Sequence, residues 1–400
     1  MRTRSIAPPG MAVTAADPLA AAAGIAAGLV REAVWYRGQC NWVDAGGALG
    51  PDLGGGTAGI ALFLAHVQDA AARRTALGAI GQALAHAEQA TAHGLCAGRP
   101  GIAYAAARCG ALLGDERLLL RASRLARARP APAPAPERFD LAGGTAGTIV
   151  ALLALQDERL LVRAAGLGDA LVAAARRQSD GWCWPVPGAP RDHGLTGMAH
   201  GASGAAHALL ELFAATGDDR HRAAAQHALA YERHWLDTGE GDWPDLRGVR
   251  RDEPRGSFRS PFPGTWEHGA PGGALVRLRA AAILGDERAS AEARVALTTT
   301  ARRAEQALRD RRADFTLARG LAGSADALLL GADLLPEGAA LARRIGEVAI
   351  GRHALSVDGW PCGAPGGGRP PGLLHGHAGI GLFYLRLHDA TIPSALLVSP

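Results

Sequence analysis

Four side chains that can carry a positive charge stand at one point of a recurring motif, directly before the first glycine of G-x-x-G: His200, His268, Arg319 and His375. A carboxylate, Glu267, immediately precedes His268. Imidazoles exchange protons near neutral pH, and a guanidinium stabilises an anion. Any one of these histidines alone is most simply a residue where a helix begins. Several in one phase of a repeat, beside Glu267, are typical of a titratable cluster at an active site.

Asp140 is a further candidate, four residues before the motif that begins at Gly144 (F-D-L-A-G-G-T-A-G). A carboxylate at this point could orient a histidine from the next copy of the motif. It could equally cap the N-terminus of the helix that follows. The sequence leaves both roles open.

The motif occurs seven times, at first-glycine intervals of 42, 46, 57, 68, 51 and 56 residues, and each copy leads into an apolar run. Repeats decide the fold, so they are considered before any single motif. The copies begin at Gly56, Gly98, Gly144, Gly201, Gly269, Gly320 and Gly376. The first three are preceded by the small residues Gly55, Ala97 and Gly143.

Each copy predicts a helical hairpin. The apolar run gives an inner helix of about three turns, and a polar turn then leads to a second helix rich in alanine and arginine. We expect the inner helices to be nearly all apolar and the outer helices to expose arginine. The two glycines are expected to allow positive φ and close approach of the backbone.

Seven hairpins can stack as an open solenoid or close into a ring. Closure is favoured because the last copy (GHAGIGLFYLRL) is as apolar as the first, whereas an open array would expose both. The sequence therefore predicts an all-α fold, an (α/α)7 toroid, over residues 51–400. Residues 1–50 are predicted to be an N-terminal helical segment that packs on it. In a closed ring the residues before the motifs share one mouth.

Two segments interrupt the repeat. Residues 130–136 (PAPAPAP) predict a stiff polyproline connector between the second and third copies. An insert at about 237–264, rich in Gly, Asp, Arg and Pro, could form a lid over one mouth.

Composition narrows the class of protein. The 400 residues are 48% hydrophobic and 20% charged, with a net charge of +4 and arginine as every one of the 42 basic residues. Acidic residues are interspersed, so no basic stripe indicates nucleic-acid binding. The apolar stretch at 19–30 is too short to cross a membrane. The five cysteines are widely spaced, without a C-x-x-C pair. We therefore expect reduced thiols and a cytoplasmic protein.

Several long motifs resemble those of the lanthionine synthetase C-like (LanC-like) cyclases, in particular the C-terminal cyclase part of class II lanthipeptide synthetases. The resemblance covers most of the chain, from GQCNWVD to the end. The motifs include DLAGGTAG (140–147), GMAHGASG (197–204), FPGTWEHGAPG (262–272), LARGLAGS (317–324) and CGAPGGGRPPGLLHGHAGIG (362–381).

This resemblance implies a toroid that adds peptide cysteine thiols to dehydroalanine or dehydrobutyrine and so forms thioether rings. It also implies a zinc ion held by two cysteines and a histidine, but this sequence departs from the pattern. Glu267 replaces the first cysteine, and Ala318 and Arg319 replace the Cys-His pair. Arginine has no lone pair to donate to a metal. Cys362 matches a family cysteine that is not a ligand. We therefore expect no cofactor.

The first hypothesis is a stand-alone, zinc-independent cyclase in which His200 removes the thiol proton or protonates the enolate. Asp140 would orient the His200 imidazole. The positions that match the family's site make His268, Arg319 and Glu267 further catalytic candidates. We assign His375 and Trp266 to substrate binding. The partners would be a precursor peptide with its leader and a separate dehydratase.

Two other hypotheses remain. The chain could be a degenerate scaffold that binds the precursor peptide and partner enzymes, or a metal site could be rebuilt from His200, His268, His375 and Glu267. A toroidal glycosidase would need paired carboxylates at the mouth, and Glu267 is the only one on the ring.

Overall fold

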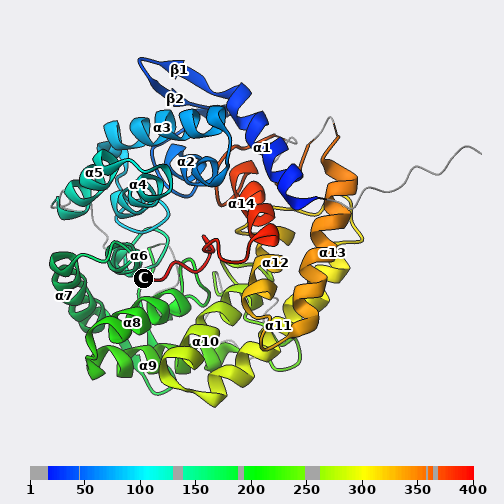
Figure 1. Cartoon of the computed structure of the whole chain (residues 1–400). Coiled ribbons are helices and arrows are strands. Elements are labelled where there is room, and N and C mark those ends of the chain that lie inside the picture. Colours follow the sequence, from blue (N-terminus) through cyan, green and yellow to red (C-terminus); the bar gives the residue numbers. More distant parts are fainter. Residues whose placement is uncertain are drawn as a thin grey trace, which may run out of the picture.

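A computed structural model describes residues 17–44, 46–128, 138–187, 193–247, 262–356, 359–363 and 368–400. These residues form two concentric layers of helices around one axis (Figure 1). The apolar core lies within the inner layer and between the layers.

The inner layer confirms the predicted repeat, because each inner helix begins directly after the first glycine of a motif. These helices are α2 (Thr57–His66), α4 (Arg99–Leu113), α6 (Thr145–Leu153), α8 (Ala202–Thr216), α10 (Ala270–Leu284), α12 (Leu321–Leu330) and α14 (His377–His388). Each packs on the next, and α14 packs on α2. The ring is therefore closed, as the sequence predicted.

The outer layer shows how the ring closes. It contains α3 (Ala70–Ala85), α5 (Glu116–Arg127), α7 (Glu158–Ala174), α9 (Asp219–Trp235), α11 (Glu287–Ala307) and α13 (Pro336–His353). The last inner helix, α14, is not followed by an outer helix. Its partner is α1 (Pro18–Glu32), which contacts α14 and also α13 and α3. The two ends of the chain thus build the seventh helix pair together.

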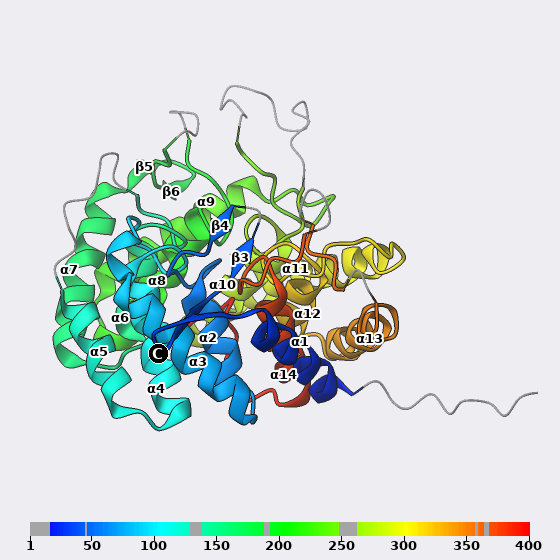
Figure 2. The same cartoon turned by 90° about the horizontal axis from the view of Figure 1, so that it is seen from above.

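Short elements connect the helices. They are β1 (Val34–Tyr36), β2 (Gln39–Asn41), β3 (Val43–Asp44), β4 (Gly47–Ala48), η1 (Ala87–Gln89), β5 (Arg176–Gln178) and β6 (Gly181–Cys183). The strands pair as antiparallel hairpins, β1 with β2, β3 with β4 and β5 with β6. Figure 2 shows β3–β4 and β5–β6 at one end of the barrel. The chain runs from these hairpins into the start of α2 and of α8.

The structure confirms the close backbone approach expected at the motif glycines and corrects the expected positive φ. Among the first glycines only Gly269 has a positive φ, of 130°. The second glycine of every motif is needed for space instead, because a Cβ there would overlap the carbonyl oxygen of the residue six positions earlier. Gly101 and Leu95 are one such pair. The loop before each inner helix therefore packs so closely on the second glycine that only a hydrogen atom fits between them.

The expectation of nearly all-apolar inner helices is wrong for half of the ring. Buried charged or polar side chains occur on α8 (His207, Glu211), α10 (Arg277), α12 (Asp326) and α14 (Arg386). Partners compensate their burial, as where Arg386 donates to Asp326. Arg277 pairs with Glu292 of the outer layer, whereas His207, Asp326 and Arg386 bond a chain segment that lies inside the ring.

Two predicted features lie partly or wholly outside the described residues. The 130–136 connector does so entirely, and only residues 237–247 and 262–264 of the predicted lid are described. Within the described part of the chain, no helix is long and apolar enough to cross a membrane.

Candidate functional site

The candidate site lies at the end of the inner barrel where the inner helices begin. The residues directly before the first glycines form a circle here called the rim: Gly55, Ala97, Gly143, His200, His268, Arg319 and His375. Backbone hydrogen bonds join the residues that precede the rim positions, from Ala318 through Gly54 to Glu267. In each bond a backbone N–H donates to a carbonyl oxygen over 2.8–3.3 Å. The pairs are Gly54 to Cys96, Cys96 to Ala142, Ala142 to Ala199, Ala199 to Glu267, Ala318 to Leu374 and Leu374 to Gly54. This belt holds the rim positions at one height.

Asp140 and His200 form the first side-chain pair of the rim, with 3.5 Å between Asp140 Oδ2 and His200 Nδ1. The backbone N–H of Gly143 donates to Asp140 Oδ1 over 2.6 Å, and Arg138 Nη2 lies 3.1 Å from Oδ2. Burial raises the pKa of Asp140, but the nearby His200 imidazole, the hydrogen bond from Gly143 and the charge of Arg138 outweigh it and lower the pKa. Asp140 is therefore a buried, charged carboxylate facing an imidazole.

The alternative role of Asp140 as a helix cap does not hold. The N-cap of α6 is Gly144, without a side-chain cap bond. The carboxylate of Asp140 bonds Gly143 and Arg138 instead. Asp140 is thus a partner of the rim residue His200, not a cap of α6.

His268 lies beside His200, with 5.9 Å between the ring centroids. Its side chain is buried, and Nδ1 is 3.1 Å from the carbonyl oxygen of Thr196. A carbonyl can only accept, so Nδ1 carries the hydrogen and Nε2 the lone pair. Nε2 has no partner among the described residues. Burial, and after it the charge of Arg247, lowers the pKa of His268, which favours the neutral imidazole.

Glu267 joins Arg319 and His375 in a second cluster. Arg319 Nε donates to Glu267 Oε2 over 2.7 Å, and His375 Nε2 is 3.3 Å from Oε1. Burial raises the pKa of Glu267, but the hydrogen bonds from His375 and Arg319 outweigh it and bring the pKa to about 2. Glu267 is 11% exposed, whereas Arg319 and His375 are 56% and 45% exposed. The Arg319 and His375 side chains therefore face solvent.

The residues at the family's zinc positions do not fit a zinc ion. Ala318 offers no donor atom, and Arg319 directs a cation at the Glu267 carboxylate. In the described ranges, no group of three His, Cys, Asp or Glu side chains could hold a metal. This also speaks against the rebuilt site from His200, His268, His375 and Glu267.

Trp266 is placed differently from the other candidates. It is 3% exposed, and its indole N–H donates to the carbonyl oxygen of Leu396 over 2.9 Å. This position leaves little surface for contact with a substrate. Trp266 lies beneath the rim, against the end of the chain.

Three residues near the rim were missed. Cys96 belongs to the same belt as Glu267. Both residues stand two positions before a first glycine, so the repeat could have identified Cys96 from the sequence. Burial, then the charges of Asp140, Asp52 and Glu267, raises the pKa of its thiol to about 12. Arg138 lies two residues before Asp140, and no pattern marked it. Arg247, held by Asp245 over 2.6–3.0 Å, comes from the insert and acts on the pKa of His268.

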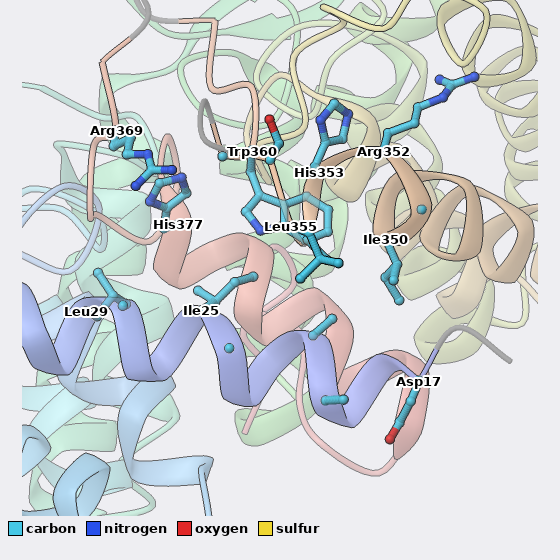
Figure 3. A pocket seen from close by; sticks show the side chains of 18 of the residues that line it. Asp17, Ile25, Leu29, Ile350, Arg352, His353, Leu355, Trp360, Arg369 and His377 are labelled. Atoms are coloured by element: carbon cyan, nitrogen blue, oxygen red, sulfur yellow. The ribbon is translucent and has the colours of Figure 1, made fainter. Parts of the chain in front are cut away.

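A pocket of about 1160 Å³ lies elsewhere, between α1 and the end of α13 (Figure 3). His377 lines it, and the neighbouring charge of Arg369 adds to burial in lowering the pKa of His377 to about 4. None of the predicted site residues lines this pocket.

Comparisons with known proteins agree with this architecture. The model of the family described as "Lanthionine synthetase C-like protein" matches residues 47–397. No curated protein matches the sequence. The solved structure of nisin cyclase is similar, with a TM-score of 0.66 and 17% identity, over 94% of this chain and 96% of that one. A structure titled as UGL with the saccharide dGlcA-Glc-Rha-Glc has a TM-score of 0.50 and 16% identity, over 84% and 97%.

At these identities the two structures show the fold alone. The family match covers most of the chain, including every rim position. The chain therefore belongs to the lanthionine synthetase C-like family.

Proposed function

We propose that this protein is a zinc-independent cyclase that adds a peptide cysteine thiol to a dehydroalanine or dehydrobutyrine of the same peptide. The observation that carries the proposal is the rim itself. It pairs an oriented, partly exposed imidazole, His200, with an exposed guanidinium, Arg319, that is fixed by a carboxylate.

His200 is suited to move the proton. Its Nδ1 is buried and faces Asp140, so the 30% of the side chain that is exposed lies on the rest of the ring. The thiol gives its proton to His200 Nε2, and the sulfur then bonds the β-carbon of the dehydro residue. The electron pair of the carbon–carbon double bond moves to an enolate, which His200 protonates at the α-carbon. No atom is gained or lost overall.

His268 supports this transfer from its buried position. Its Nε2 lone pair has no partner in the described part of the chain and lies on the ring adjacent to His200. A neutral imidazole there can accept a hydrogen bond as His200 changes its protonation. The lowered pKa of His268 keeps a second positive charge away from His200.

Arg319 supplies a positive charge at one of the family's zinc positions. Its Nε is held by Glu267, which leaves its two Nη groups to face an incoming anion. A nearby cation lowers the pKa of a thiol and stabilises an enolate. A decrease of one to two pKa units corresponds to about 1.4–2.7 kcal/mol. His375, on the other side of Glu267, adds an exposed donor for the peptide backbone.

The partners follow from this chemistry. The chain would act on a precursor peptide with a leader, in the cytoplasm, after a separate dehydratase has removed water from serine or threonine. All five cysteines are unpaired thiols, which supports a reducing compartment.

A second candidate function is a scaffold that binds the peptide without catalysis. The observation that favours it is the replacement of all three residues at the family's zinc positions, by Glu267, Ala318 and Arg319. The ordered Asp140–His200 pair is not needed for such a role.

One experiment separates the two functions. The protein is incubated with a dehydrated peptide that holds one cysteine, and remaining thiols are counted by alkylation and mass spectrometry. We expect thiols to disappear faster than without enzyme, at a rate that a zinc chelator does not change. An unchanged thiol count supports the scaffold, and a rate abolished by chelation refutes zinc independence.

A further inference from the structure

The last residues of the chain enter the inner ring. After α14 ends at His388, the chain turns and crosses the centre of the barrel (Figure 1). We call residues 392–398 the axial segment. Ser394, Leu396 and Val398 within it are 4%, 1% and 4% exposed. These residues of the axial segment are therefore packed inside the protein, whereas Ile392, Ala395 and Leu397 are half-buried and Pro393 is exposed.

Polar side chains from several inner helices hold this segment. His207 Nε2, on α8, bonds the carbonyl oxygen of Val398 over 2.8 Å. Asp326, on α12, accepts a hydrogen bond from the Ser394 hydroxyl. Arg386, on α14, donates to the carbonyl oxygen of Ile392. The segment is thus bonded on different sides of the ring.

The residues that bond the axial segment, together with Glu211 and Arg279, stand at repeating positions and form a second polar layer below the rim. His207 and Asp326 each stand six residues after a first glycine, while Glu211, Arg279 and Arg386 stand ten residues after one. Arg279 bonds Glu211 through two contacts of 2.6 and 2.8 Å. His207 follows His200 by seven residues and lies more than one turn into α8.

The axial segment also touches the site directly. The indole of Trp266 donates to Leu396, and Glu267, the next residue, holds Arg319 and His375. The axial segment thus lies directly beneath the loop that carries Glu267.

We infer that the peptide enters and leaves by the rim alone, as a loop, and never threads through the ring. The inference rests on the proposed function and defines its substrate class. The reacting cysteine and dehydro residue can lie in any internal loop, and the peptide needs no free end. Backbone-cyclic peptides and peptides blocked at both ends are therefore substrates.

The test uses one dehydrated peptide in three forms: linear, carrying a folded protein domain on each end, and closed head to tail through its backbone. Flexible linkers keep the domains clear of the reacting residues. We expect the rates of thioether formation to agree within a factor of a few. Loss of activity in both blocked forms, with the linear form active, would overturn the inference. If no form reacts, the proposed function fails instead.

A second measurement does not depend on activity. Val398→Cys and Ser399→Cys place a thiol in the axial segment and at its exposed neighbour. Labelling by a maleimide, followed by peptide mapping, should be about 100-fold slower at position 398. Equal rates in a protein of unchanged melting temperature would show that the segment leaves the axis, and would overturn the inference even if the cyclase is active.

Discussion

Replacing His200 by alanine is the most direct test of the proposed mechanism. General acid–base catalysis by one side chain contributes about 10²–10⁴ in rate, or about 2.7–5.5 kcal/mol. We therefore expect His200→Ala to lower kcat by that factor. The fold should survive, because His200 is 30% exposed and Asp140 keeps its bonds from Gly143 and Arg138. The free energy of unfolding should change by about 1 kcal/mol or less.

The assay measures kcat and KM for thioether formation by thiol alkylation and mass spectrometry, with a thermal melt of each variant. The matched control is His388→Ala, which removes an exposed imidazole from the opposite end of α14. We expect the control to cyclise at the parent rate. A His200→Ala protein that is folded and equally fast would refute the role of His200. A melting temperature far below the parent's would show instead that the imidazole is structural.

Three further predictions concern Asp140 and the second cluster. Asp140→Asn should lower kcat by about tenfold or more with little change in KM, because an amide cannot stabilise a protonated His200; an unchanged kcat would contradict this. Arg319→Met should lower the rate at neutral pH by about 10–100-fold and move the rate profile to higher pH, since a peptide thiol regains its ordinary pKa, and Arg319→Lys should restore part of it; a profile that does not move would refute it. The pKa of Glu267 is lowered to about 2 in the folded state, so its contribution to stability is present above the unfolded value of about 4.5 and is lost as the pH falls toward 2. Between these pH values, chemical denaturation should show the parent losing about 1–2 kcal/mol more than Glu267→Gln, a figure reduced for the exposure of Arg319 and His375; parallel losses would contradict it.

The repeat made most of the fold predictable. Seven motifs with one spacing of glycines imply seven equivalent helices, and the apolar last copy implies closure. The partnership of α1 with α14 was not predictable in this way, because α1 carries no motif and its contacts join residues at opposite ends of the chain. Long-range pairing of this kind leaves no local signal.

The candidate site was predictable where it follows the repeat and unpredictable elsewhere. The phase of the motif places His200, His268, Arg319 and His375 on one rim. Arg247 could not be found, because it reaches the site from an insert outside the repeat. The polar residues that hold the axial segment stand at repeating positions after the first glycines, which the sequence shows. Nothing in the sequence indicated that they bind another segment, because the inner helices were expected to be apolar.

The charges of the second cluster suggest that the replacements at the family's zinc positions depend on each other. Glu267 is 11% exposed, and a carboxylate buried to that extent needs partners that donate to both oxygens. Arg319 and His375 supply them, one to each oxygen. Arg319 without Glu267 would keep its charge but lose the contact that fixes the direction of its guanidinium. The pair therefore maintains an oriented positive group, without any metal ligand, at the point where the peptide anion is proposed to form.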